Sequence, residues 1–483
     1  MKQTSTKKRI PLIIGLILIL ALLFTNSKLI NSNQQSDGNT NIPVIPSIDT
    51  SLTSTYIASL PKFPTVAQSP TVPVVFTATS TLQPPQCTFP LVNVKYPESK
   101  QEEYIFSEPH VVLTVPEGNH LNVAQWLPDN QQVLVVEDLR NQYVESNDTT
   151  VQESISLYNI QTGESKLYAT RVITGEPPVW QPHVNGVVYS SANYTKIDKL
   201  HGAYQSAPQL WISYGDSGTA QLLAEKLSQN TLLLKPDGSE ILYFLDKQIA
   251  KLDGILNKLP VISFDPTQWD YAKEGRDDKP VSYHMVWQPG TSLVFLYSSA
   301  GGTSAGGYTF ILDTTNGHIC NLNLGGWASR AHWSSDGRYL AIASPSSYTG
   351  ISDIIKLVVL DSTTGNLRTV EVVPQDLKGN HDVSDFTWTP DNLHLLVLED
   401  IPSTYDPYRY ETIHHELYLV DFISNQSLQL FPEYKSFIAG GAPSNNFVWS
   451  PDYSKLLVRC PIIKMPTKGI DRFCLISVQE NGQ

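Results

Sequence analysis

The chain has 483 residues and a formal net charge of −13 at pH 7, with 41% hydrophobic and 16% charged residues. This content is ample for a packed core and too low in charge for a disordered protein. From Cys87 onward, 27 Lys and Arg residues stand against 44 Asp and Glu residues, a net charge of −17. Because such a surface repels phosphate backbones, the composition argues against nucleic-acid binding.

The N-terminus is a basic stretch followed by an apolar run. Lys7, Lys8 and Arg9 precede residues 10–27, which contain no charged side chain. As a helix, this run would be about 27 Å long, close to the roughly 30 Å hydrocarbon core of a bilayer. The preceding positive charges predict export of everything that follows. We therefore expect residues 1–30 to be a signal anchor in the membrane or a cleaved signal peptide; no convincing A-x-A site decides between them.

The next segment, residues 31–86, contains eight prolines, many Ser and Thr residues and only three charges. It shows no sustained hydrophobic period, which is typical of a linker. We expect it to hold the rest of the chain clear of the membrane.

Residues 87–483 contain a pattern that occurs seven times. Each copy has a short strand that ends in Trp (Leu in the third copy), a tight polar turn and an apolar strand. Pro-Asp-Gly and Pro-Asp-Asn turns supply a fixed φ and tolerate a positive φ. A second hairpin signal follows in most copies, so each copy offers four strands. The anchor positions are spaced by 46 to 61 residues and are Trp126, Trp180, Leu234, Trp287, Trp333, Trp388 and Trp449.

This repeat predicts an all-β fold, a seven-bladed β-propeller of four-stranded antiparallel blades. The Trp side chains are expected to pack between neighbouring blades. The last copy lacks an outer strand, which Cys87–Val115 is expected to supply, removing an open edge. The W-x-P-D-G pattern resembles the TolB-like and WD-like propeller repeats of exported bacterial proteins. That resemblance covers residues 87–483 and implies the fold, but propellers have many unrelated functions.

Loop lengths distinguish the two faces of such a propeller. The first face carries only the tight A–B and C–D turns (the tight-turn face), and the second carries long B–C and inter-blade segments (the loop face). Tyr and Trp in these long segments are candidate ligand-binding residues, because they bury area at low entropic cost. The alternative is that they pack the loops onto the blades. The candidates are Tyr194, Tyr204, Tyr348, Tyr405, Tyr408, Tyr410, Trp269 and Trp327.

Ionisable residues on or just before the innermost strands are candidates to line the central channel. Converging carboxylates and imidazoles there would bind Ca²⁺ or act as acid and base, as in propeller lactonases and lyases; alternatively they hydrate a polar channel. The candidates are His284, His332, His381, Asp382 and Asp385.

A metal site at His414-His415-Glu416 is not expected. On a strand, His414 and Glu416 share one face while His415 points away, which leaves too few ligands. No cofactor is expected elsewhere.

The four cysteines show no metal or redox spacing. An antiparallel turn between two strands of the last repeat predicts a disulfide between Cys460 and Cys474. The rival pairings join Cys87 to either of these two residues. We expect Cys320 to be a free, buried thiol.

These features favour a membrane-tethered module outside the cytoplasm that binds a protein, peptide or glycan through its loop face. One alternative is a lactonase-like hydrolase or lyase that uses the channel residues, and another is a propeller that partners a separately encoded hydrolase. Three or more His or acidic side chains converging at the channel mouth would favour the enzyme.

Overall fold

The structure is a computed structural model. Contacts divide the chain into two units, Met1–Thr71 and Val72–Gln483. The described residues all belong to the second unit and are 84–97, 102–115, 120–138, 153–172, 177–191, 194–198, 202–205, 208–215, 220–228, 231–265, 283–298, 309–322, 324, 328–345, 355–372, 382–402, 413–434, 436–437, 445–462 and 472–480. Within these ranges, no helix is long and apolar enough to cross a membrane. The expected signal segment and residues 31–83 of the expected linker lie outside these ranges. The signal segment and the linker therefore stay predictions.

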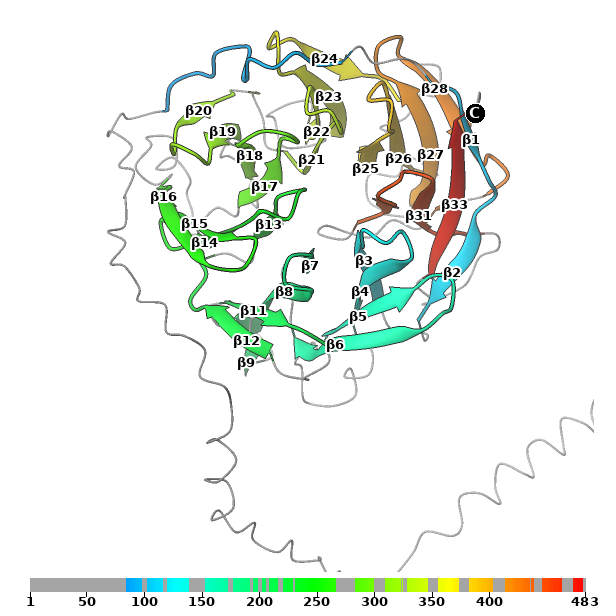
Figure 1. Ribbon diagram of the computed structural model, residues 1–483. Helices are drawn as coiled ribbons and strands as arrows, with labels where there is room; N and C mark the ends of the chain where they lie inside the picture. The colour runs from blue at the N-terminus through cyan, green and yellow to red at the C-terminus, as the bar shows by residue number, and fades with distance from the viewer. Residues whose placement is uncertain are drawn as a thin grey trace, which may run out of the picture. The chain divides into compact units, whose positions relative to one another are not determined.

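The described strands form seven antiparallel blades around a ring, as the repeat predicts (Figure 1). Each of the seven has a four-stranded core, written here from the innermost strand outward. Blade 1 is β3 (His120–Trp126), β4 (Gln132–Asp138), β5 (Glu153–Asn159) and β6 (Ser165–Val172). Blade 2 is β7 (Val179–Gln181), β8 (Gly186–Ser191), β11 (Gln209–Ser213) and β12 (Ala220–Ala224). Blade 3 is β13 (Leu232–Leu234), β14 (Glu240–Leu245), β15 (Gln248–Asp253) and β16 (Lys258–Ser263).

The remaining four blades follow in chain order. Blade 4 is β17 (Tyr283–Trp287), β18 (Leu293–Ser298), β19 (Thr309–Asp313) and β20 (Ile319–Asn321). Blade 5 is β21 (Arg330–Trp333), β22 (Tyr339–Pro345), β23 (Ile355–Asp361) and β24 (Leu367–Val370). Blade 6 is β25 (Asp382–Trp388), β26 (His394–Pro402), β27 (Ile413–Asp421) and β28 (Gln426–Leu430). Blade 7 has β30 (Phe447–Trp449), β31 (Lys455–Arg459) and β33 (Arg472–Glu480).

The outer edge of blade 7 comes from the N-terminal side of the propeller, as expected. β2 (His110–Thr114) pairs with the first half of β33, and β1 (Tyr104–Phe106) pairs with its second half. Strands from the N-terminal side of the propeller therefore complete its last blade. This exchange covers the edge of β33 that would otherwise be open to pairing with another chain.

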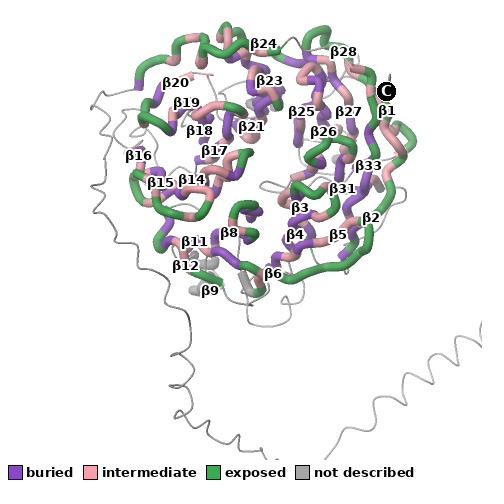
Figure 2. The backbone as a smooth tube through the Cα atoms, viewed as in Figure 1, coloured by how far each residue is buried: buried purple, intermediate pink, exposed green. Residues whose placement is uncertain are grey.

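The core lies between the blades, where Figure 2 shows buried backbone on adjacent sheets. The expected position of the tryptophans is confirmed. Trp388 of blade 6 packs with Tyr339 of blade 5, and its Nε1 donates to the carbonyl oxygen of His332 at 2.9 Å. Trp126 of blade 1 donates in the same way to Val448 of blade 7, at 2.8 Å. Each of these rings thus fills a seam and satisfies its own N–H there.

The tight turns adopt the backbone that their residues permit. In the A–B turn of blade 5, Gly337 has φ +78°, and a Cβ at this position would lie 2.7 Å from the Pro289 carbonyl oxygen. In blade 6, Asn392 takes the equivalent left-handed position with φ 61°. Glycine and asparagine tolerate this region best, so the turn chemistry read from the repeat sets the hairpins.

A segment without strands crosses the outside of the ring before β1. This segment, residues 84–97, is called the strap here, and Figure 1 shows it passing β20 and β24. Its first part is fixed to blade 4: Cys87 N donates to Asn321 O at 3.0 Å, and Asn321 N donates to Pro85 O at 2.8 Å. The strap therefore adds a short parallel contact to the outer strand of blade 4.

The strap then follows blade 5 toward its tight-turn end. Leu91 N donates to Ser362 O at 2.9 Å, and the Tyr96 hydroxyl donates to Gly337 O at 3.4 Å. The Phe89 ring lies over Gly365, where a Cβ would come within 2.5 Å of it. Glycine at 365 therefore serves both the positive φ of the turn and the approach of the strap.

The cysteine pairing is partly as expected. Cys460 and Cys474 form a disulfide, although the ladder partner of Cys474 is Val458, so the bridge runs diagonally between β31 and β33. The expectation of a free Cys320 was wrong, because Cys320 forms a second disulfide with Cys87. The reason is that the strap places Cys87 beside β20 of blade 4, whereas only residues after it reach blade 7.

Two additions extend the loop face. A hairpin of β9 (Tyr194–Asp198) and β10 (Gly202–Gln205) occupies the expected B–C loop of blade 2. In blade 6, β29 (Ser436–Phe437) pairs with β27, and β32 (Pro461–Ile462) pairs with β29. These short strands link the loop-face end of blade 6 to the connection that follows β31.

Candidate functional site

Asp385 is the most engaged of the channel candidates. Its Oδ1 lies 3.3 Å from Arg330 Nη1 of blade 5, and its Oδ2 accepts a 2.8 Å hydrogen bond from Asn446 Nδ2 beside blade 7. The backbone N–H groups of Phe386 and Asn446 also donate to this carboxylate. Since the side chain is buried, Asp385 acts as a charged clamp that joins the inner strands of three consecutive blades.

The two described channel histidines are held in packing contacts. The His332 ring meets the Phe386 ring edge-on at 5.2 Å. Burial lowers the pKa of His332, the Asp385 charge opposes this shift and the Arg330 charge adds to it. The imidazole is therefore neutral near pH 7. His284 stacks on Tyr297 with ring centroids 5.1 Å apart.

The remaining channel candidates divide between described and undescribed positions. Asp382 begins β25 and lies opposite Asp400 in the ladder. His381 lies outside the described residues. The structure therefore does not bring the five candidates together as one acid–base group within its described part; it joins Asp385 to His332 through their shared contact with Arg330 and Phe386.

The aromatic candidates of the loop face are not described as side chains. Tyr194 and Tyr204 lie on β9 and β10, where Tyr194 pairs with Gln205 and Tyr204 with Thr195. The others fall outside the described residues and stay predictions: Tyr348, Tyr405, Tyr408, Tyr410, Trp269 and Trp327.

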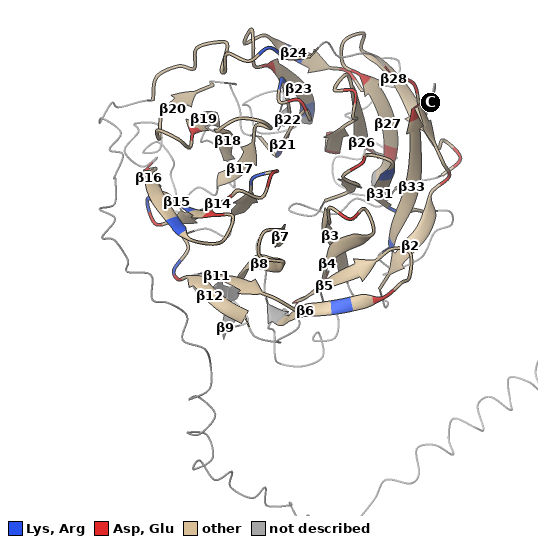
Figure 3. Ribbon diagram, viewed as in Figure 1, with Lys and Arg blue, Asp and Glu red and all other residues tan. Residues whose placement is uncertain are grey.

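Ionisable side chains gather instead at the loop-face end of blade 6. This group, called the blade 6 cluster here, lies on β25, β26 and β27 and contains Asp382, Glu399, Asp400, His414, His415 and Glu416. Figure 3 colours the Asp and Glu positions of the ribbon red. The cluster borders residues 403–412, the segment that carries three of the candidate tyrosines. Sequence reasoning placed His414, His415 and Glu416 on one strand but did not foresee their partners on β26.

One half of the cluster faces blade 5. The His414 Nε2 atom lies 3.3 Å from Glu416 Oε1, and the Tyr418 hydroxyl donates to Glu416 Oε2 at 2.5 Å. Tyr418 packs among blade 5 residues such as Leu357, which fixes the direction of this face. Glu399 lies opposite Glu416 in the ladder, so its side chain points to the same face of the blade.

Glu399 is the most perturbed acid of this half. Only 4% of the residue is exposed, and its Oε2 has no hydrogen-bond partner among the described residues. Burial, followed by the charges of Asp400, Asp382 and Glu416, raises the pKa of Glu399 to about 8. At pH 7 the carboxyl group is therefore mostly protonated, a condition found at many functional sites and at some structural ones.

The other half of the cluster faces blade 7. His415 Nδ1 lies 2.5 Å from Asp400 Oδ1, and the His415 backbone N–H donates to Ser436 Oγ of β29 at 2.9 Å. The alternation expected for a strand is thus confirmed, since His414 and His415 point to opposite faces. Among the described residues, no three His, Cys, Asp or Glu side chains are placed to share a metal ion.

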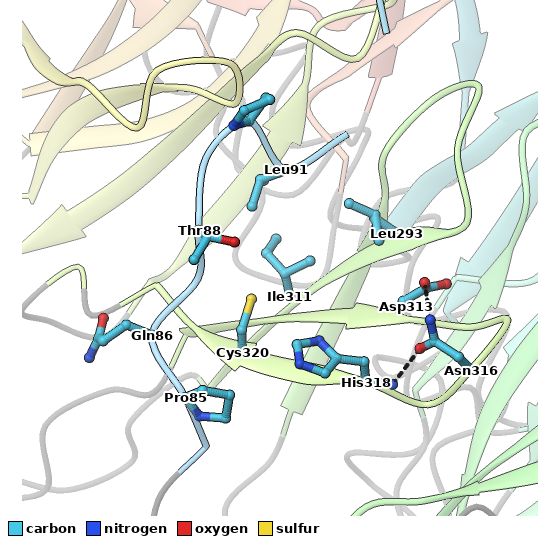
Figure 4. Close-up of a pocket in the computed structure, with 11 residues that line it drawn as sticks. Pro85, Gln86, Thr88, Leu91, Leu293, Ile311, Asp313, Asn316, His318 and Cys320 are labelled. Atoms are coloured by element: carbon cyan, nitrogen blue, oxygen red, sulfur yellow. Dashed lines mark hydrogen bonds between the residues drawn. The ribbon is translucent and has the colours of Figure 1, made fainter. Parts of the chain in front are cut away.

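A cavity of about 310 Å³ lies between the strap and the outer part of blade 4 (Figure 4). The apolar part of its lining comes from Leu293 and Ile311 of blade 4 and from Leu91 of the strap, with Cys320 beside them. At its edge, Asn316 donates to Asp313 Oδ2 and accepts from the His318 N–H, both at 2.7 Å. These polar groups are used within the turn, and the cavity belongs to the attachment of the strap.

No protein-family model and no curated sequence matches the chain. Similar solved structures are β-propellers of several kinds. An oligogalacturonate lyase from Vibrio parahaemolyticus has 11% identity and a TM-score of 0.47, covering 78% of this chain and 98% of its own. A periplasmic gluconolactonase from Pseudomonas aeruginosa has 14% identity and a TM-score of 0.41, covering 67% and 86%. A putative TolB from Agrobacterium tumefaciens has 14% identity and a TM-score of 0.36, covering 77% and 94%. No activity is carried over from them to this chain.

Proposed function

We propose that the protein is a non-enzymatic binding module, held outside the cytoplasm by its N-terminal segment, that takes a protein, peptide or glycan on its loop face. The observation that carries this proposal is the engagement of Asp385. Both of its oxygens are committed to the side chains of Arg330 and Asn446 and to the backbone N–H groups of Phe386 and Asn446. A carboxylate held in this way stabilises the ring and is poorly placed to exchange protons with a substrate.

The geometry gives less support to a channel enzyme. A neutral, half-buried His332 and a stacked His284 serve as packing surfaces. The His and acidic side chains that do gather lie on β25, β26 and β27 at the loop-face end of blade 6, and β26 and β27 flank the segment between Pro402 and Ile413. That position favours recognition by the loop face over chemistry in the channel.

The test is a triple substitution of Tyr405, Tyr408 and Tyr410 with Ala in the full chain. Partners are captured on the immobilised wild-type protein, identified, and titrated against both proteins. We expect the triple variant to bind at least tenfold more weakly with an unchanged circular dichroism spectrum. Tyr214→Ala is the matched control, because this exposed tyrosine lies in a C–D turn on the tight-turn face.

Equal binding by the triple variant and the wild type would move the site away from this loop. Turnover of a captured ligand, abolished by Asp385→Asn under conditions where circular dichroism shows that the variant remains folded, would favour the enzyme instead.

A further inference from the structure

At the loop face, the seam between blades 5 and 6 ends in ionisable side chains that differ in their exposure to solvent. The side chains of Glu416 and His414 are 22% and 32% exposed, so both reach the surface. Glu399 lies beneath them on the neighbouring strand and is 4% exposed. Glu399 Oε2 is a buried carboxyl oxygen without a hydrogen-bond partner in the described part of the chain. Buried polar atoms are ordinarily paired, so this atom points to a missing partner, which is a donor when the carboxyl group is ionised.

The charges around Glu399 are negative on each of the three inner strands of blade 6. Asp382 lies on β25, Asp400 on β26 itself and Glu416 on β27. From blade 5, Arg330 and His332 of β21 face blade 6, and Arg330 pairs with Asp385. Tyr339 and Arg368 also contact blade 6, but at its tight-turn end, where Tyr339 packs with Trp388 and Arg368 donates to the carbonyl oxygens of Phe422 and Ile423. Within the described residues, no Lys or Arg forms an ion pair with Glu399, Asp400 or Glu416; the partners of Asp400 and Glu416 are histidines and a tyrosine.

We propose that this seam seats a positively charged group of the ligand, an Arg or Lys side chain of a protein or peptide, over Glu416 and Glu399. The inference rests on the loop-face binding proposed above and names its ligand chemistry. An incoming guanidinium has five donors, enough to replace His414 at Glu416 Oε1 and to supply Glu399 Oε2. The contact to be displaced is long, at 3.3 Å, and partly exposed to water, so its loss costs little.

Binding of such a group is linked to a proton. Burial and the neighbouring acids raise the pKa of Glu399 to about 8, so only about one molecule in eleven has this group ionised at pH 7. A seated cation favours the ionised form, and binding at pH 7 therefore releases a proton. The fraction ionised rises about tenfold between pH 7 and pH 9, and the affinity rises by the same factor.

The experiment titrates the full chain with fluorescein-labelled octa-arginine and, separately, octa-glutamate, at 0.15 M salt and at pH 7, 8 and 9. Arginine keeps its charge throughout this range. We expect octa-arginine to bind, with affinity rising about tenfold, and octa-glutamate not to bind. Glu399→Gln should remove the pH dependence, and Glu416→Gln should weaken binding about tenfold at every pH.

The matched control is Glu164→Gln, which makes the same charge change at an exposed position of the tight-turn face of blade 1. It should leave the octa-arginine affinity unchanged. If Glu164→Gln and Glu416→Gln weaken binding equally, the peptide responds only to the overall acidity of the protein, and the seam proposal is overturned. An affinity that is flat between pH 7 and 9 overturns it too.

Selection of peptides from a random library tests this inference separately from the proposed binding function of the loop face. Selected peptides that depend on Tyr405, Tyr408 and Tyr410 but contain no Arg or Lys, and that ignore Glu416→Gln, overturn the seam alone. Selected peptides that ignore the three tyrosines overturn the loop-face function. Enrichment of Arg or Lys together with sensitivity to Glu416→Gln supports the inference.

Discussion

Glu399→Gln removes a carboxyl group that the fold holds in its neutral form. The pKa of this group rises from 4.5 to about 8 on folding, because of burial first and the nearby acids second. The folded state therefore binds this proton more tightly than the unfolded chain does. Its contribution to stability is complete below about pH 4.5 and is lost as the pH rises through 8. Glutamine has nearly the same shape as glutamate but does not titrate.

The size of the effect follows from the two pKa values. Each pH unit between them changes the free energy of unfolding by about 1.4 kcal/mol. Relative to the glutamine variant, the wild type should lose about 2.5 kcal/mol of stability between pH 5 and pH 7. This is a large fraction of the stability of an ordinary domain.

The assay is urea unfolding of the full chain at pH 5, 6, 7 and 8, followed by tryptophan fluorescence. We expect the free energy of unfolding of the variant, relative to that of the wild type, to rise steadily with pH. The denaturant slope should be the same in both proteins. The exposed Glu164→Gln substitution should show a difference that does not change with pH. A constant difference between Glu399→Gln and the wild type would refute the reasoning, because it would mean that Glu399 is already ionised in the folded protein.

Three further predictions concern the ring and its attachments. Replacing both Cys87 and Cys320 with Ser should lower the free energy of unfolding by about 3 to 5 kcal/mol, since this disulfide spans 233 residues, and should expose the strap to proteases in a time course where the wild type stays intact. Asp385→Asn removes the negative charge that faces Arg330 and should cost about 3 kcal/mol in chemical denaturation; a loss below about 0.5 kcal/mol would show that the clamp is dispensable. Deleting residues 1–80 should leave the thermal midpoint unchanged, and loss of folding would show that the expected linker takes part in the fold.

The number of blades could be predicted because the signal is local and repeated. Each tight turn is decided by a few residues, such as Asn392 or Gly337, whose left-handed backbone needs no distant partner. Each apolar strand that follows must be buried on both faces, and a ring of packed sheets provides this. The Cys460–Cys474 bridge was predictable for the same reason, since the two residues are 14 apart on adjoining strands.

The tertiary structure alone decided where the strap lies and which cysteine it meets. Residues 84–97 have no hydrophobic period, and their hydrogen bonds go to turns and strands of blades 4 and 5 that lie hundreds of positions later in the sequence. Cys87 therefore pairs with Cys320, a partner that no local pattern indicates. Glu399 is a similar case, because a Glu at the end of an apolar strand ordinarily carries a negative charge. Its neutral form results from the ladder register that sets it opposite Glu416, and from the blades that exclude water around it.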